Sequence, residues 1–308
     1  MKNNFFENKK VLVTGGAGVI GRELVNYLKE QNAIIRVVDM AEKPSFLNGI
    51  EYFRMDLSID CQFLFRFDPE YVFHLAADFE RSEETEEFWE SNFRNNIIAS
   101  HNLIKNIINK KSLKKVVFAS SYLIYDKDLY NDISKQNLLS ENSRIEPRNL
   151  TGIAKLQTEM DLEFLSKNKF DYTSARIYRV YGRGSRDIIS RWARNLLDQK
   201  EIEVFDEENK FDYIFAGDVA MGLLKLCESK SVGTYNLGFG QSRTVKEVLD
   251  IFKNELGEFS VKKSSNSIFK ESSLADISKL KKEINWQPET SLEMGIKKII
   301  EYEKSKNE

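Results

Sequence analysis

The segment Lys10–Gly21, KVLVTGGAGVIG, constrains the fold more than any other part of this 308-residue chain. Its first five residues form a nearly continuous apolar run, which is typical of a buried strand. The glycines Gly15, Gly18 and Gly21 follow at regular spacing, and a helical apolar pattern starts directly after them. Glycine lets the backbone turn sharply and approach a pyrophosphate, and the helix N-terminus offers free N–H groups and a positive dipole. The segment predicts a strand–turn–helix unit that binds a dinucleotide.

A carboxylate strengthens this prediction, because a glycine pattern alone would also fit a tight turn that binds nothing. Asp39 ends a second apolar run, IIRVVD, residues 34–39. At this place a carboxylate can accept hydrogen bonds from both hydroxyls of a ribose. It would also repel a 2′-phosphate, so the sequence favours NAD over NADP.

The alternation of strands and helices predicts the fold class. Further strand patterns lie at 70–76, 114–120 and 171–177, with helical patterns near 88–110 and 152–168. Such alternation predicts an α/β fold, a Rossmann-like doubly wound parallel sheet. The final third is more mixed, with strands such as 201–205 and 234–238 among short helices, and predicts a smaller mixed α/β substrate lobe. We assign residues 1–178 and 211–237 to an NAD-binding domain, and residues 179–210 and 238–308 to a discontinuous substrate-binding lobe.

Composition argues against several classes of partner. The net charge is −2 without a basic stripe, which argues against a nucleic-acid partner. No apolar run approaches the roughly 18 residues of a membrane span, so no membrane partner is expected. Two histidines and two cysteines, all scattered, do not form a typical zinc cluster, and we predict no metal. The low cysteine count fits a reducing cytoplasm.

Beyond the glycine turn, landmarks continue in order to residue 288: VFHLAA (72–77), VVFASSYLIY (116–125), GIAKLQTE (152–159), ARIYRVYG (175–182) and WQP (286–288). In this combination the chain resembles the extended short-chain dehydrogenase/reductase family, especially its NAD-dependent nucleotide-sugar epimerases and dehydratases. The resemblance implies a Rossmann-like domain with a small substrate lobe and a tightly held NAD. It also implies a homodimer formed through two helices, here near 94–110 and 152–168.

The resemblance also implies cofactor contacts. Asp56 would contact the adenine, Lys155 would hold the nicotinamide ribose, and Tyr178 would lie beside the nicotinamide. The alternative is that Lys155 binds no cofactor and is a solvent-exposed lysine on a helix. The full predicted cofactor set is Gly15, Gly18, Val19, Ile20, Gly21, Asp39, Met40, Asp56, Leu57, Leu75, Ala76, Ala77, Asn96, Lys155 and Tyr178.

One departure affects the chemistry. The predicted catalytic residues are Ser121, Tyr122, Thr151 and Lys155, and Thr151 stands where the family carries a tyrosine base. A phenol has a pKa near 10, which a neighbouring ammonium can lower, whereas an aliphatic hydroxyl is a far weaker acid. Three interpretations stay open. Another group supplies the base, with Tyr122 as the candidate, although Tyr122 could equally be a packed aromatic. Alternatively, Thr151 and water support slow oxidation, or the protein is a catalytically silent NAD-binding subunit or regulator.

The remaining motifs narrow the reaction. The dehydratases of the family place Asp-Glu after the serine or threonine, where this chain has Tyr122 and Leu123, so elimination of water is not expected. Oxidation of a sugar ring carbon is left, most simply C4. If the hydride returns, the enzyme is an epimerase, and if it stays, a dehydrogenase.

The substrate side of the sequence departs from the family as well. Phe211 replaces an arginine of many relatives, and Arg179 replaces their usual asparagine. We therefore predict that Arg179, with Arg191 or Arg183, holds the substrate pyrophosphate, the alternative being surface ion pairs. The nucleotide is left open among UDP, GDP and dTDP. A GDP-linked hexose or heptose in surface-polysaccharide synthesis fits by family analogy.

Overall fold

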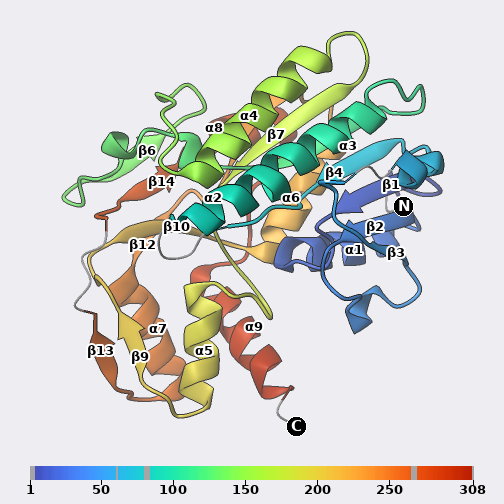
Figure 1. The fold of residues 1–308 in the computed structure, drawn as a ribbon. Helices are drawn as coiled ribbons and strands as arrows, with labels where there is room; N and C mark the ends of the chain where they lie inside the picture. The colour runs from blue at the N-terminus through green and yellow to red at the C-terminus, as the bar shows by residue number, and fades with distance from the viewer. Residues whose placement is uncertain (1–3, 60–61, 80–83, 265–268, 307–308) are drawn as a thin grey trace. The chain divides into compact units, whose positions relative to one another are not determined.

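The computed structural model describes residues 4–59, 62–79, 84–264 and 269–306 (Figure 1). The chain forms two compact units. The first unit comprises Met1–Asp126, Ile145–Arg176 and Ala220–Tyr235, and the second comprises Lys127–Arg144, Ile177–Val219 and Asn236–Glu308. This division by packing places residues 127–144 and 211–219 in the second unit, whereas the sequence-based division assigned them to the NAD-binding domain.

A seven-stranded sheet organises the first unit, in the order β11-β7-β5-β4-β1-β2-β3. The neighbouring strands β1, β2, β3, β4 and β5 pair in parallel. The chain order reverses between β1 and β4, and in such a sheet ligands bind beyond the carboxyl ends of the strands at the reversal. The strands are β1 (Lys10–Thr14), β2 (Ile34–Asp39), β3 (Glu51–Arg54), β4 (Tyr71–His74), β5 (Lys115–Ser121), β7 (Asp171–Ile177) and β11 (Gly233–Leu237). The predicted doubly wound parallel sheet is therefore confirmed.

Helices cover both faces of this sheet (Figure 1), with α3 and α4 on one face and α1 and α6 on the other. Leu24 and Leu28 lie on the buried side of α1, and the helix stops before Asn32, which has a positive φ of 57°. On the opposite face, Leu103 of α3 and Leu162 of α4 pack with Val116 and other residues of the sheet. The helices are α1 (Val19–Glu30), α2 (Glu86–Asn92), α3 (Ala99–Ile107), α4 (Leu150–Leu165) and α6 (Ala216–Glu228).

The region predicted as one helix near 88–110 differs in the structure. Between α2 and α3 the residues Phe93–Ile98 form a π-helical turn. Within this turn the side chain of Asn96 bonds to Asp78: its oxygen accepts from the backbone N–H of Asp78 at 2.7 Å, and its nitrogen donates to the Asp78 carbonyl at 2.8 Å. A long-range contact, rather than local propensity, accompanies this turn.

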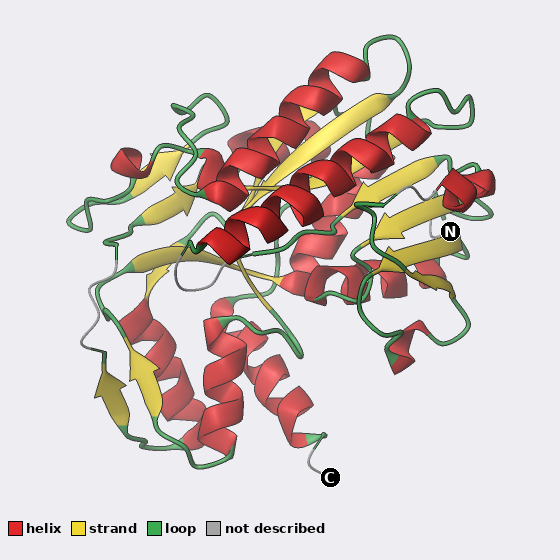
Figure 2. Ribbon diagram, viewed as in Figure 1, coloured by secondary structure: helices red, strands yellow, loops and turns green. Residues whose placement is uncertain are grey.

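The second unit is smaller and mixed, as predicted (Figure 2). A three-stranded sheet has the order β12-β10-β8, and two parallel pairs, β13–β9 and β14–β6, accompany it. Helices α5, α7 and α9 share an apolar core with β8, β9 and β10. The elements are β6 (Asn137–Leu139), β8 (Arg179–Tyr181), α5 (Ile188–Leu197), β9 (Ile202–Val204), β10 (Lys210–Phe215), β12 (Ser242–Thr244), α7 (Val245–Leu256), β13 (Val261–Lys263), β14 (Ser273–Ala275), α8 (Ser278–Ile284) and α9 (Leu292–Lys304).

None of the helices in the described part of the chain combines the length and the apolar character that crossing a membrane requires.

Candidate active site

In the glycine turn after β1, the backbone at Gly15 and Gly21 is packed so closely that neither position has room for a Cβ atom. Gly15 has a φ of +74°, and a Cβ atom on it would lie 2.6 Å from the backbone nitrogen of Ala76. A Cβ atom on Gly21 would lie 2.4 Å from the carbonyl oxygen of Gly15. Gly18 occupies the N-cap of α1 and has no side chain to cap the helix. The first N–H groups of α1, including those of Val19 and Ile20, have no partner within the helix. Together with the closely packed glycine backbone they form a cradle that suits a pyrophosphate.

Asp39 lies at the end of β2 and is fixed beside this turn. Its Oδ2 accepts from the backbone N–H of Ala17 at 2.9 Å, and its Oδ1 accepts from that of Ala41 at 3.0 Å. The next residue, Met40, is half exposed. A rigid carboxylate next to the cradle fits the predicted recognition of a ribose.

Asp56, predicted to contact the adenine, and its neighbour Leu57 have different environments. Asp56 accepts from the backbone N–H of Ser58 at 2.8 Å, and Arg94 approaches its Oδ2 to 4.0 Å. Leu57 is buried in the core, and its carbonyl accepts from the side chain of Asn102. Asp56 is therefore oriented by its own turn, whereas the Leu57 side chain mainly packs.

A chain of hydrogen bonds connects the ends of β1 and β4. Thr14 Oγ1 lies 2.7 Å from Nδ1 of His74, and Nε2 of His74 lies 2.8 Å from Oγ of Ser100. Ser100 donates to the carbonyl of Asn96 at 2.5 Å, and the N–H of Ala76 donates to Thr14 Oγ1 at 3.3 Å. This chain holds the segment Leu75–Ala77, which was predicted to lie under the cofactor, against the π-helical turn.

The predicted catalytic residues come from the end of β5 and the start of α4. Ser121 is the last residue of β5, and its Oγ accepts from the N–H of Leu123 at 3.2 Å. The 3₁₀ turn Tyr122–Ile124 packs under α4, since a Cβ atom on Gly152 would lie 2.5 Å from the Leu123 carbonyl. Asn149 caps α4 by accepting from the N–H of Gly152 at 2.8 Å. The close packing explains why the motif has glycine at this position.

Thr151 and Lys155 lie four residues apart on α4 and thus share one face of the helix. Gly152, next to Thr151, packs against the Leu123 carbonyl, and Lys155 bonds to Ala119 of β5, so this part of α4 lies beside the end of β5 and the turn that follows it. Ser121, Tyr122, Thr151 and Lys155 are all buried, with relative exposures of 6%, 3%, 1% and 3%. Their catalytic roles remain predictions.

Lys155 is not a solvated helix lysine. Its Nζ donates to the carbonyl of Ala119 at 2.7 Å and lies 4.7 Å from the ring centroid of Phe118. Burial lowers the pKa of Lys155 to about 7, against the opposing effect of the Glu159 carboxylate. Its ammonium can make three hydrogen bonds, so donors remain for a ribose besides the bond to Ala119.

A buried ion pair follows one turn later on α4. Arg176 of β7 donates through Nη2 to Glu159 at 2.8 Å, and through Nη1 to the hydroxyl of Tyr125 at 3.1 Å. All three side chains are buried. The ion pair connects α4 to β7 one helical turn beyond Lys155. Sequence reasoning noted Glu159 as part of a motif but did not find its partner.

Three predicted site residues lie in the second unit: Tyr178, Arg179 and Arg191. Tyr178 is buried, and its N–H donates to the carbonyl of Leu237. Arg191 has an exposed side chain on α5. For these residues the predicted contacts with cofactor and substrate remain predictions.

Arg179 has a defined environment. Its Nη2 lies 3.3 Å from Oε2 of Glu271, and its Cζ lies 4.3 Å from the ring centroid of Phe211. Glu271 is buried and also accepts from the hydroxyl of Ser273 at 2.8 Å. The Arg179 side chain is 42% exposed, and its guanidinium is held between a carboxylate and an aromatic ring. Both Phe211 and Glu271 orient it.

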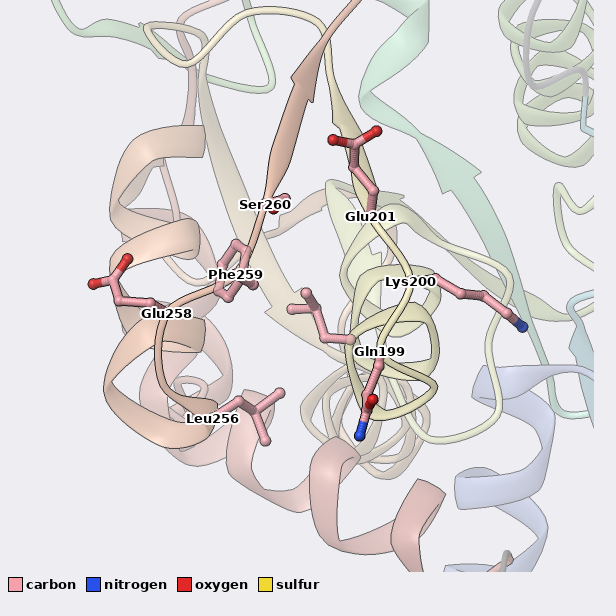
Figure 3. Close-up of a pocket in the computed structure, with 8 residues that line it drawn as sticks. Gln199, Lys200, Glu201, Leu256, Glu258, Phe259 and Ser260 are labelled. Carbon is pink, nitrogen blue, oxygen red and sulfur yellow. The ribbon is translucent and has the colours of Figure 1, made fainter.

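The second unit also contains an open cavity of about 440 Å³ between α5, β9 and the segment after α7 (Figure 3). In Figure 3 the side chains of Lys200 and Glu258 point to opposite sides. The polar groups do not converge, so this cavity is not assigned a ligand. Its lining residues are Leu196, Gln199, Lys200, Glu201, Leu256, Glu258, Phe259 and Ser260.

A metal centre is not indicated either. Within residues 4–59, 62–79, 84–264 and 269–306, histidine, cysteine, aspartate and glutamate form no group of three or more that could hold an ion.

Comparison with known proteins agrees with this geometry. The family model described as "NAD dependent epimerase/dehydratase family" matches residues 11–238. A putative UDP-glucose 4-epimerase of Methanocaldococcus jannaschii is 27% identical, with 96% of this chain and 99% of the relative covered. The dTDP-4-dehydro-6-deoxyglucose reductase of Escherichia coli is 26% identical, with 94% and 96% covered.

Solved structures show the same similarity. The UDP-glucose 4-epimerase of Thermotoga maritima with UDP-glucose has a TM-score of 0.84 and 28% identity, with 97% of this chain and 99% of that chain covered. The UDP-glucose 4-epimerase of Thermus thermophilus in complex with NAD has a TM-score of 0.82 and 25% identity, with 96% and 98% covered.

Proposed function

Because the chain belongs to the NAD dependent epimerase/dehydratase family, we propose that it oxidises a ring carbon, C4, of a nucleotide-linked sugar. The observation that carries this proposal is the buried Lys155, held at the end of β5 beside Ser121, in the same unit as the glycine cradle and Asp39. Burial of an ammonium costs free energy that polar contacts must offset. The nicotinamide ribose would supply one of them.

NAD is the cofactor of the family, and the residues present fit it. The cradle of Gly15, Gly18 and Gly21 would hold the pyrophosphate, Asp39 a ribose, and Lys155 the ribose next to the nicotinamide. When bound, NAD accepts a hydride from the sugar carbon. The Asp39 carboxylate favours NAD over NADP because it repels a 2′-phosphate.

The protein's own residues orient the sugar and remove its proton. Ser121 would hydrogen-bond the reacting hydroxyl. Thr151 stands at the place of the family's tyrosine, and a threonine hydroxyl cannot be made an efficient base by a neighbouring ammonium. The proposal therefore requires a different proton acceptor.

The relatives support a UDP- or dTDP-linked sugar as the first substrates to test, since their names carry these nucleotides. The GDP-linked hexose or heptose remains a prediction from sequence, as does cytoplasmic localisation. Arg179, placed by Glu271 and Phe211, would contribute positive charge toward the pyrophosphate.

We further propose a homodimer through α4 and the helices beside it. Exposed apolar side chains gather there, although large apolar side chains on a monomer surface are usually scattered. On α4 these are Ile153, Met160 and Phe164, and on the adjoining α2 and π-helical turn they are Trp89 and Phe93. Figure 1 shows α4 beside α2 and α3. A second copy of this face would cover these residues.

The test of the proposed reaction starts with purified protein, denatured to identify any released dinucleotide. Undenatured protein is then incubated with UDP-, dTDP- and GDP-linked hexoses, and the sugars are followed by NMR. Interconversion of C4 epimers without net NADH supports an epimerase, and stoichiometric NADH supports a dehydrogenase. Bound NAD without turnover of any sugar would contradict the proposal and favour a silent NAD-binding subunit.

A further inference from the structure

Glu84 belongs to none of the sequence motifs described above. Its carboxylate contacts Leu150, the first residue of α4. Its Oε1 accepts from the N–H of Leu150 at 2.6 Å. Asn92 of α2 donates to the carbonyl of the same residue at 3.3 Å. The next residue, Thr85, caps α2 by accepting from the N–H of Phe88 at 3.1 Å. The backbone N–H and the carbonyl of Leu150 thus each have a side-chain partner, and the cap at Thr85 fixes the backbone next to Glu84.

This contact places the Glu84 carboxylate at the N-terminus of α4, one residue before the predicted catalytic residue Thr151. Leu150 immediately precedes Thr151, which is 1% exposed. Earlier in the connection between β4 and α2, Phe79 lies with its ring centroid 5.7 Å from Nζ of Lys155. Residues before α2 therefore reach α4 both at Lys155 and next to Thr151.

The chemistry of the alternatives favours Glu84. A threonine hydroxyl is a poor base, and the Lys155 ammonium already donates to Ala119. Tyr122 is 3% exposed, and the backbone of its turn packs against Gly152 of α4. Glu84 is exposed, and its carboxylate lies at the N-terminus of α4. One of its oxygens binds Leu150, and a carboxylate has a second oxygen that can accept a proton.

Resting on the function proposed above, we propose that Glu84 accepts the proton of the reacting sugar hydroxyl. As the C4–H bond breaks, its electron pair leaves as hydride to the nicotinamide. The hydroxyl O–H bond also breaks, its electron pair completes the C4 carbonyl, and the proton forms a new O–H bond on Glu84. In an epimerase, Glu84 returns this proton when the hydride returns to the other face of C4.

The decisive variant is Glu84→Gln, because its amide oxygen still accepts from Leu150 while the side chain no longer accepts a proton. We expect kcat to fall by about 10² to 10⁴, the range of general base catalysis. Bound NAD content and Tm should stay at wild-type values. Glu87→Gln, which alters an exposed carboxylate three residues away, is the matched control and should keep wild-type kcat.

A rescue experiment separates a base from a structural cap. In Glu84→Ala, added formate should restore turnover in a concentration-dependent manner, whereas Glu84→Gln should not respond. Wild-type kcat in Glu84→Gln would overturn the inference, and so would a slow Glu84→Ala enzyme that formate does not accelerate. Loss of activity in Tyr122→Phe with an active Glu84→Gln enzyme would return the role to Tyr122. If the wild type turns over no sugar, the proposed function itself fails and this inference with it.

Discussion

The Nδ1 atom of His74 lies 2.7 Å from the Oγ1 atom of Thr14, and this contact belongs to a buried chain of hydrogen bonds. Ser100 donates its proton to the carbonyl of Asn96, so it accepts from Nε2–H of His74. In the neutral ring, Nδ1 then accepts from the Thr14 hydroxyl. His74 is therefore an ordering residue beneath the predicted cofactor site, not the missing base.

This arrangement predicts acid sensitivity. Burial, helped by the charge of Lys155, lowers the pKa of His74 to about 3. Between pH 6.5 and 3 the unfolded chain binds a proton at this residue that the folded chain does not bind. The free energy of unfolding should therefore fall as the pH drops, by about 1.4 kcal/mol per pH unit from this residue.

Urea unfolding of the protein at pH 7, 6 and 5 measures this slope. His74→Gln should be less stable than the wild type at pH 7, because the hydrogen-bond chain is broken, but should show a shallower decline toward pH 5. His101→Gln, on an exposed position of α3, should keep the wild-type slope. Equal slopes for wild type and His74→Gln would refute the prediction.

Lys155 predicts a pH dependence of the same sign on the alkaline side. Its pKa is lowered from 10.5 to about 7 by burial. Between these values the unfolded chain keeps a proton that the folded chain has released, so the protein without NAD should gain stability as the pH rises from 7 to 10. The gain is on the order of 1 kcal/mol per pH unit.

Lys155→Met should remove this gain and also lower turnover sharply, because the ribose contact is lost. Lys167→Met, at an exposed position just beyond α4, is the control and should change neither. Thermal unfolding of NAD-free protein between pH 7 and 10 gives the measurement. A Lys155→Met protein with the wild-type pH dependence would show that another group is responsible.

The glycine turn allows a graded test of cofactor binding. A Cβ atom on Gly21 would lie 2.4 Å from the carbonyl of Gly15, whereas one on Gly18 would meet that carbonyl at 3.3 Å. Gly21→Ala must therefore displace backbone and should abolish tight NAD binding, with about 1 to 3 kcal/mol of destabilisation. Gly18→Ala should weaken binding less. Titration of NAD by calorimetry would decide, and a Gly21→Ala protein that binds NAD as tightly as Gly18→Ala would contradict the packing argument.

The sequence predicted the sheet well because its central strands are buried on both faces. β1, β2 and β7 coincide with predicted strands at 10–14, 34–39 and 171–177. Continuous apolar runs between glycine or polar residues are a local signal. The glycine turn and Asp39 were predictable for the same reason, since their roles depend on short spacing.

Features formed by distant residues were not predictable. The π-helical turn accompanies a contact of Asn96 with Asp78, and the apolar pattern around it still reads as a regular helix. Arg179 was predicted to face a pyrophosphate, but its partner Glu271 lies 92 residues away. Glu84 approaches Leu150 across 66 residues. No local spacing encodes such pairs.

The pair of Arg179 and Glu271 yields a prediction that separates stability from ligand binding. Arg179→Ala leaves a buried carboxylate without this guanidinium, and removal of one partner of a buried pair is strongly destabilising. Because Arg179 is 42% exposed, we expect a loss of only about 1 to 2 kcal/mol. The double variant Arg179→Ala, Glu271→Gln should recover most of this stability.

Nucleotide-sugar affinity should not recover in the double variant if Arg179 binds the pyrophosphate. Urea unfolding and calorimetric titration of both variants provide the two readouts. Wild-type affinity in Arg179→Ala would remove this residue from the substrate site. A double variant that is no more stable than Arg179→Ala would show that the carboxylate is not the source of the instability.

The exposed apolar face of α4 predicts self-association. Phe164 is 72% exposed and Met160 is 58% exposed, four residues apart on one side of the helix. In a dimer formed through this face both would be covered, and a glutamate at either position would place a charge in an apolar interface. We expect Phe164→Glu and Met160→Glu each to raise the dimer dissociation constant by at least tenfold, or about 1.4 kcal/mol.

Met294→Glu, at a 52% exposed position on α9, is the control. Analytical ultracentrifugation over a concentration series measures all four proteins. A wild type that stays monomeric at high concentration would refute the dimer, and a Met294→Glu protein that alone dissociates would move the interface to α9.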